Sequence, residues 1–547
     1  MMNTAKKISS AKLFKTILSL VMVLSILVGC SMMFAGCSDS GSGSGEETKA
    51  PAGNKHDPAQ YEGLNDEEYL QKLGYNNLSD AVAALTDAYD AYKSSLGKSA
   101  SAGAKGTMTI TVGDDILDML EDAAGGNMKF DFLSKINLDV NVGMKDDLSQ
   151  VEMGIGLNNK KIATANLLVD MANAAMYLAI PEVNATYVKL GMGAMSGNAY
   201  ATPGSATSVQ GMMAAMAELG EALPSGDQLE TIINSYLKVV LEEIDDVERT
   251  SVKQELGGLK QDQTQLTVKL YQEDLLNMAK AVLTKAENDD DIKKIIEDVV
   301  KGVAEMTGET MDEAEIYGQF RDAVKNALEV VEASRENLDT ENYMTITVNT
   351  DSVHNVVGFA AELPGSESMG INYVSVTEGD KTAMQLIGKD ADTTVFEIAG
   401  EGTVKNGKSS GTYAVVVQGE QILTFQTKNL DAKGGTITLK PTEDVLDEIT
   451  GGTDLPFNDL ALEITMAEGE LELNVLTGKK VLLGIAVEAK ETSVGSIKLP
   501  TNFVDSNDSS AMEQWLSNAK FDVLLNNLKK AGVPSDLVDS LGSMLGG

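Results

Sequence analysis

The chain has 547 residues, with 43 basic and 82 acidic side chains and a formal net charge of −39. This acidic balance argues against nucleic acid and against anionic membrane surfaces as direct partners. Aromatic residues make up 5% of the chain, with a single Trp, which argues against a sugar-binding cleft. The 26 Met residues are typical either of an adaptable core or of a site for a soft, variable ligand.

The first fifteen residues carry four lysines and no acid, and an apolar run follows over about 17–34. This pattern predicts a secretory signal peptide. The alternative is an N-terminal membrane-spanning helix, because the run nearly reaches the roughly 20 apolar residues that a span needs.

Both cysteines of the chain lie at the end of this run, in LVGC (27–30) and FAGC (34–37). Both tetrapeptides resemble the lipobox of bacterial lipoproteins, in which the cysteine receives a diacylglyceryl group and the peptide is cut just before it. LVGC fits the lipobox better, but Cys37 directly precedes a polar, Gly/Ser-rich tether that suits a lipid anchor. We therefore predict lipidation at Cys37, with Cys30 as the alternative. The resemblance implies acyl chains such as palmitate, a cell-membrane location and a body that faces away from the cytoplasm.

The next apolar pattern has helical spacing and predicts an amphipathic helix over 78–97. The period then changes to two, which predicts a hairpin over 135–157. Short strands are expected near 161–171, 174–180 and 185–192, so this part of the chain is predicted to be a β-meander.

A mainly helical insertion is predicted over about 206–338, interrupted by a strand-like segment at 265–271. Thr310 and Glu313 resemble a capping box at the start of its last helix.

Alternating strands return from 343 to 350 onward. Asn406 and Gly407 predict a tight hairpin turn, and a final meander over 460–489 has turns at AEGE and TGKK. Two short helices, around Trp515 and Leu525, are expected to end the chain.

These patterns predict an α+β fold: a large curved antiparallel β-sheet, in one or two pieces, with a helical insertion and short terminal helices. The predicted organisation is a signal peptide at 1–36, the lipidated cysteine and tether at 37–60, the sheet domain or domains at 61–510 and C-terminal helices at 511–547.

Candidate catalytic and metal residues are few. The chain has only two histidines, His56 in the tether and His354, which we expect to face solvent in a turn. With both cysteines near the N-terminus and no histidine pair, a zinc site of the usual kind is not expected. Asp289 begins an acidic triplet that lacks the ligand spacing and central Gly of a calcium loop.

Two short motifs resemble enzyme signatures. Asp390, Asp392 and Thr394 resemble the nucleophile loop of haloacid-dehalogenase phosphatases, but that loop needs a parallel sheet and these residues lie among predicted hairpins. Ser95 and Lys98 match the SxxK of penicillin-recognising enzymes without the other motifs of that family. We therefore predict no catalytic residues, no metal, no cofactor and no enzymatic activity.

The predicted strands over 103–505, together with the lipid anchor, resemble the LolA-like carriers and the related mycobacterial envelope lipoproteins. The resemblance implies a concave sheet that encloses an apolar cavity for a lipid or other hydrophobic ligand. The alternative function is a surface interaction or structural lipoprotein without a small ligand, in which the interior is filled.

Overall fold

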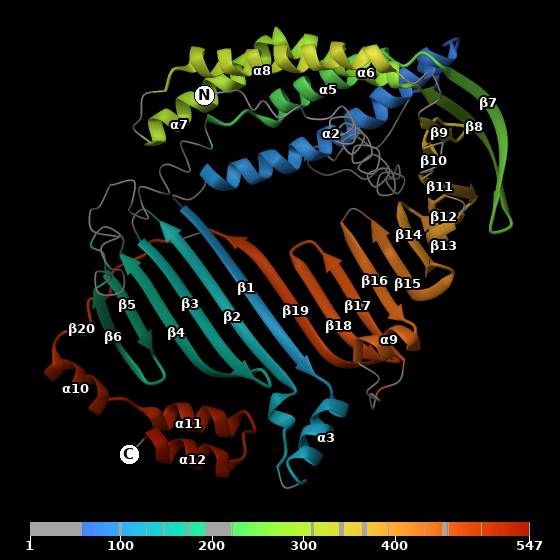
Figure 1. Cartoon of the computed structure of the whole chain (residues 1–547). Helices are drawn as coiled ribbons and strands as arrows, with labels where there is room; N and C mark the ends of the chain where they lie inside the picture. The colour runs from blue at the N-terminus through green and yellow to red at the C-terminus, as the bar shows by residue number, and fades with distance from the viewer. Residues whose placement is uncertain are drawn as a thin grey trace, which may run out of the picture.

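In the computed structural model, the chain is an α+β protein built on one sheet of 20 strands, with a layer of helices along one side (Figure 1). The structure describes residues 57–97, 101–126, 128–145, 148–170, 173, 175–191, 220, 222–307, 311–338, 344–363, 369–391, 393–431, 433–450, 457, 459–493 and 495–545. The predicted fold class is confirmed.

The strands of the first meander, with the short strand that joins it, are β1 (Ser101–Val112), β2 (Lys135–Lys145), β3 (Leu148–Leu157), β4 (Lys160–Asp170), β5 (Ala175–Ile180), β6 (Asn184–Gly191) and β20 (Phe503–Asp505). The strands of the second meander are β7 (Val247–Leu256), β8 (Leu259–Leu270), β9 (Met344–Thr350), β10 (Val356–Leu363), β11 (Met369–Glu378), β12 (Lys381–Asp390), β13 (Thr393–Lys405), β14 (Lys408–Val417), β15 (Glu420–Asp431), β16 (Gly434–Pro441), β17 (Leu460–Ala467), β18 (Glu470–Thr477) and β19 (Lys480–Thr492).

The α-helices are α2 (Asp66–Gly97), α3 (Asp114–Ala123), α5 (Gly226–Glu242), α6 (Gln272–Glu287), α7 (Asp290–Thr307), α8 (Glu313–Ser334), α9 (Glu443–Thr450), α10 (Ser509–Ser517), α11 (Phe521–Lys530) and α12 (Ser535–Leu545). The short 3-10 helices are η1 (Pro58–Tyr61), η3 (Asp131–Leu133) and η5 (Arg335–Asn337).

The two predicted meanders form a single sheet. The second meander pairs in chain order from β7 to β19, β19 pairs with β1, and the first meander continues from β1 to β6. All of these pairs are antiparallel, whereas β20 adds to β6 in parallel. β1, the first strand of the first meander, pairs with β19, the last strand of the second meander, and this pairing joins the two meanders into one sheet (Figure 1).

Over its central strands the sheet has one apolar and one polar side. Residues that pair across neighbouring strands share a side, so the registers trace the apolar side from strand to strand. From Leu462 on β17 it passes through Leu439, Phe425 and Tyr413 on β16, β15 and β14. Further along it reaches the covered strands β9 and β8 at Val348 and Leu266, which pair with each other.

Within the described part of the chain, the helix layer covers this apolar side only at the end formed by β7 to β10. Figure 1 shows α2, α5, α6, α7 and α8 along the top of the curled sheet, with α2 nearest the strands. The main hydrophobic core lies there, between helices and strands. Its buried members are Tyr61, Tyr69, Leu70, Leu73, Leu266, Val268, Leu270, Leu275, Met278 and Met344.

The C-terminal helices pack at the other end of the sheet and on its opposite side. A smaller core there contains Leu168, Ala175 and Tyr177, next to Ile497. Hydrogen bonds tie the helices to the strands: the Trp515 indole donates to the backbone carbonyl of Thr186 over 2.8 Å, and Asn527 Nδ2 donates to the carbonyl of Ile162 over 3.0 Å.

Several predicted element boundaries were wrong for local reasons. Helix α2 begins at Asp66 rather than 78, because Asn65 and Glu68 cap each other reciprocally, over 2.8 and 3.1 Å. The end at Gly97 is confirmed. Helix α8 is capped by Asp312, whose Oδ1 accepts hydrogen bonds from two backbone amides. The predicted Thr310 cap is therefore wrong, and Thr310 itself lies outside the described residues.

Several elements were not predicted, among them helices α3 and α9. The helical insertion contains a full hairpin, since β7 precedes the predicted strand at β8. Strand β10 follows the turn at His354, and α12 is a third C-terminal helix. None of the helices in the described part of the chain is long and apolar enough to span a membrane.

Candidate functional site

The central strands β17, β18, β19, β1, β2 and β3 present an apolar surface that the helix layer leaves uncovered. We call the apolar side of these six strands the open face. Three rows of paired residues define it: Met466, Leu471, Val487, Met108, Leu138 and Ile155; then Ile464, Leu473, Ile485, Ile110, Ile136 and Leu157; then Leu462, Val475, Leu483 and Val112. Every one of these side chains is aliphatic, and none is charged or aromatic.

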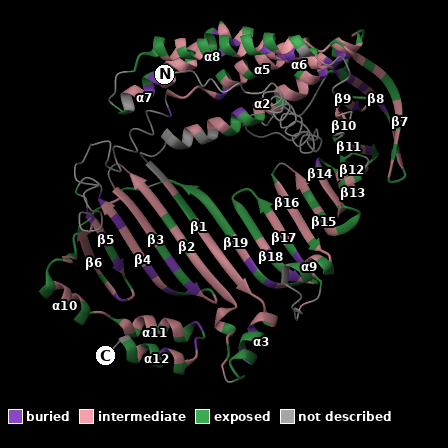
Figure 2. Cartoon of the chain, in the orientation of Figure 1, coloured by how far each residue is buried: buried purple, intermediate pink, exposed green. Residues whose placement is uncertain are grey.

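The open face is exposed to solvent. Large aliphatic side chains remain between 36% and 50% exposed on four of its strands, β3, β17, β18 and β19. Figure 2 shows exposed stretches along β17, β18 and β19. These side chains are Met153, Ile155, Leu462, Met466, Leu471, Val475, Leu483 and Val487. Isolated exposed apolar residues are ordinary, whereas a contiguous group of them marks a surface for a ligand, a partner or a membrane.

The other side of the same strands is polar and makes hydrogen bonds between neighbouring strands. Thr107 Oγ1 donates to Asp139 Oδ1 over 2.9 Å, and Asn137 Nδ2 donates to Thr109 Oγ1 over 3.0 Å. An antiparallel sheet normally turns such a side to water and packs the apolar side on a core. The open face is therefore the side that needs a cover.

The backbone offers nothing further to a ligand at this surface. Each of the six strands is paired with a strand on both sides, so no free edge is available for an added strand. Without charges, rings or free backbone groups, the open face can make only aliphatic contacts. This chemistry fits binding of a flexible apolar ligand and does not fit acid–base or nucleophilic catalysis.

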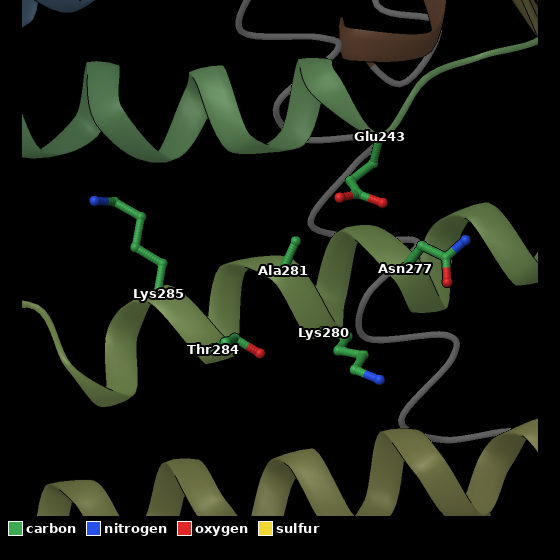
Figure 3. A pocket seen from close by; sticks show the side chains of 6 residues that line it. All are labelled: Glu243, Asn277, Lys280, Ala281, Thr284 and Lys285. Atoms are coloured by element: carbon green, nitrogen blue, oxygen red, sulfur yellow. The ribbon is translucent and has the colours of Figure 1, made fainter.

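Two hollows lie within the helix layer rather than against the open face. The larger, about 430 Å³, is lined by Glu243, Asn277, Lys280, Ala281, Thr284 and Lys285. Figure 3 shows Lys280 and Lys285 leaving α6 in opposite directions. Lys280 pairs with Glu332 over 2.7 Å and Lys285 with Asp289 over 3.2 Å, so both cations are already neutralised.

The smaller hollow, about 280 Å³, lies between α2 and α5 and is lined by Gln71, Lys72, Tyr75, Lys238, Leu241 and Glu242. Both hollows mix charged, polar and apolar side chains. Neither is the apolar cavity that the sequence suggested; the extended apolar surface of the sheet is open instead.

Half of the sequence-predicted site residues fall outside the described residues. These are both candidate lipidation sites, Cys37 and Cys30, together with His56, Lys98 and Asp392. Ser95 lies within the last turns of α2.

The acidic motifs have structural roles where they are described. Asp390 ends β12 and Thr394 lies in the antiparallel neighbour β13, which is the hairpin context expected from the sequence. Asp289 caps α7, accepting hydrogen bonds from the amides of Asp291 and Ile292 over 3.0 and 3.2 Å. Over the described ranges, no three metal-binding side chains of the His, Cys, Asp or Glu type come together.

His354 is not the solvent-facing residue that the sequence suggested. Its ring stacks on Tyr61, with centroids 4.2 Å apart, and its Nδ1 lies 2.8 Å from the Tyr69 hydroxyl. The prediction was wrong because the two tyrosines lie almost 300 residues earlier in the chain, and no local pattern marks them as partners of the turn.

No protein family model matches the chain, and no curated protein matches it. Among solved structures, it shows a likeness to a crystal structure of a mutant of the vaccine antigen transferrin binding protein B from Haemophilus parasuis Hp5. The identity is 8%, the match covers 73% of this chain and 78% of the other, and the TM-score is 0.11. A likeness at this level supports no conclusion about function.

Proposed function

We propose that the chain is a non-enzymatic lipoprotein, anchored in the cell membrane and facing away from the cytoplasm, that binds a lipid or another hydrophobic ligand. The observation that carries this proposal is the open face: three rows of paired aliphatic side chains across six adjoining strands, many of them more than a third exposed. In a chain with a net charge of −39, such a surface is stabilised most by an apolar ligand, because that ligand removes the aliphatic side chains from water.

The dimensions and composition of the open face favour acyl chains. Six strands at a spacing of about 4.8 Å span about 24 Å, several chain widths. Each buried methylene contributes about 0.8 kcal/mol, so a chain of about 16 carbons that buries half its surface contributes on the order of 6 kcal/mol. That figure corresponds to a Kd of tens of micromolar, so a two-chain lipid should bind more tightly than a single fatty acid.

The anchor is proposed on the lipobox resemblance, with Cys37 as the lipidated residue and Cys30 as the alternative. The sequence predicts a Gly/Ser-rich tether over 37–60. A flexible chain of about 20 residues has a root-mean-square extension of about 25 Å, which would keep the sheet close to the membrane surface.

A titration with a fluorescent two-chain phospholipid tests the proposal. The purified chain should bind the probe saturably, and unlabelled phospholipid should displace it. The double variant Ile155→Asn, Leu483→Asn on the open face should weaken binding at least tenfold. The matched control Glu152→Asn, on the polar side of β3, should leave binding unchanged.

The second candidate is a surface interaction lipoprotein without a small ligand. The observation that favours it is that the apolar surface is open rather than enclosed, so the apolar surface of a protein partner would also fit. Non-saturable probe binding that is equal in the open-face variant and in the Glu152→Asn control would support this candidate and reject lipid binding.

A further inference from the structure

One histidine joins η1 and the first turns of α2 to the turn between β9 and β10. His354 lies in the turn between β9 and β10, in a left-handed conformation with φ of 65°. Its imidazole stacks on Tyr61 of η1 at 4.2 Å and meets the edge of Tyr69 of α2 at 5.6 Å. Its Nδ1 shares a hydrogen bond of 2.8 Å with the Tyr69 hydroxyl, which also lies 3.2 Å from Oγ1 of the fully buried Thr350.

A cation lies against the same tyrosine. The Arg249 guanidinium of β7 stands over the Tyr69 ring at 4.8 Å. Arg249 is held there by Asp66, over 3.0 Å from Nε to Oδ1, and by the carbonyl of Leu64, over 3.0 Å. Tyr69 therefore contacts a permanent positive charge on β7 and a titratable ring in the β9–β10 turn.

This contact holds the cover on one end of the apolar side of the sheet. Tyr61 and Tyr69 are 4% and 3% exposed, and both belong to the main hydrophobic core. In that core the first turns of α2 pack on Leu266 of β8 and Met344 of β9, which belong to the apolar side of the sheet. If η1 and the start of α2 moved away from the sheet, the apolar side of β8 and β9 would also become exposed to solvent.

We propose that His354 is a proton-operated latch: neutral, it holds η1 and the first turns of α2 on the sheet, and its protonation releases them. The latch is a property of the fold alone. Its consequence, a larger apolar surface for a ligand at low pH, rests on the proposed function.

The charges around the ring give the direction of the effect. The titratable and charged groups that face it or its partners are Tyr61, Tyr69, Asp66, Asp80, Arg249 and Asp351. Of the carboxylates, Asp66 is paired with Arg249. The oxygens of Asp351 already accept hydrogen bonds from the amides of Val353 and Asn355 and from the Asn355 side chain, over 2.9 to 3.0 Å. An imidazolium at this position would gain little compensation for its burial.

Burial lowers the pKa of His354, and the Asp351 carboxylate opposes this shift. A released histidine has a pKa of about 6.5. Because the docked ring binds its proton less readily, the docked state is fully stable above about pH 6.5 and loses stability as the pH falls from there toward the lowered pKa. Within that window the opening equilibrium should rise by up to about tenfold per pH unit.

Hydrogen exchange of the full chain, without lipid, tests the latch. After correction for intrinsic exchange rates, the segment 61–73 should exchange faster at pH 5.5 than at pH 7.5, while β12 to β14 should not change. His354→Asn, which suits a left-handed φ and cannot titrate, should abolish this difference. Tyr61→Phe, which keeps the stacked ring, should retain it. An equal pH response in His354→Asn, or none in the unaltered chain, overturns the proposal.

A second measurement does not depend on the variant folding. The chain has only two histidines, so an NMR titration with labelled histidine shows two signals, and the signal that is lost in His354→Asn belongs to His354. His354 should titrate below the ordinary histidine value of about 6.5, and titration at or above that value overturns the latch. Phospholipid titrations at pH 7.5 and 5.5 separate the two proposals. A pH response without lipid binding rejects the proposed function alone, and lipid binding without a pH response in α2 rejects the latch alone.

Discussion

Two leucines on the same side of the sheet should differ sharply in their contribution to stability. Leu266 on β8 is 0% exposed and lies in the main core, whereas Leu483 on β19 is 43% exposed on the open face. Leu266→Ala removes a fully buried side chain and leaves a cavity, which typically costs about 3 to 5 kcal/mol. Leu483→Ala removes a side chain that buries only about half its surface and leaves no enclosed cavity, so its cost should be about 1 kcal/mol.

The assay is urea unfolding of the purified chain, followed by circular dichroism. The shift of the unfolding midpoint should be about three to five times larger for Leu266→Ala than for Leu483→Ala, with an unchanged m-value in both. The two variants are matched controls because they make the same substitution on strands of the same sheet side. A cost for Leu483→Ala as large as that for Leu266→Ala would show that the open face is covered in solution, and the reasoning about a binding surface would fail.

Three further predictions concern the lipid anchor, one glycine, and stability without a metal or a disulfide. Metabolic labelling with a fatty-acid analogue should mark the protein, and Cys37→Ser should remove most of the label; loss of label with Cys30→Ser alone would show that the other lipobox is used. Gly113→Ala should cost about 1 to 3 kcal/mol in urea unfolding, because the added Cβ would collide with the Val481 carbonyl oxygen. Gly191→Ala, which meets no atom within 4 Å, should change stability by less than about 0.5 kcal/mol, and an equal effect of the two substitutions would contradict the close approach. Chelator and reductant should leave the melting temperature unchanged, since the chain has no cysteine after Cys37 and only two histidines; a large drop with chelator would expose a metal site.

The alternating pattern of the sequence predicted many strands correctly because each has one apolar and one polar side. The hairpin over 135–157 is β2 and β3, and Asn406 and Gly407 make the predicted tight turn with φ of 51° and 72°. The same pattern carries no information about which strand pairs with which. The insertion of β1 between β19 and β2 joins residues nearly 400 positions apart, so the sequence left open whether there is one sheet or two.

The sequence did not predict the open face. It suggested an apolar cavity enclosed by a curved sheet, because the chain resembles lipid-carrying lipoproteins, has many Met residues and has few aromatic residues. It did not show which part of the apolar side the helices cover. Apolar and polar residues alternate in the same way along β8, which lies under the helices, and along β2, which belongs to the open face. The packing of His354 was missed for a similar reason, because its partners lie on distant elements.

Chain connectivity explains why the cover stops where it does. Helix α5 leads into β7, and α6, α7 and α8 connect β8 to β9, so short connections keep these helices over the strands that they join. Strands β17, β18 and β19 are instead joined by tight turns at Glu468-Gly469 and Gly478-Lys479, which leave no helix to lie on them. The described helices of the chain therefore cover the core at β8 and β9, while they leave the similarly aliphatic open face exposed to solvent. Covering an exposed apolar surface with any apolar group is favourable in free energy. This is the physical reason for proposing ligand binding at the open face rather than in the helix layer.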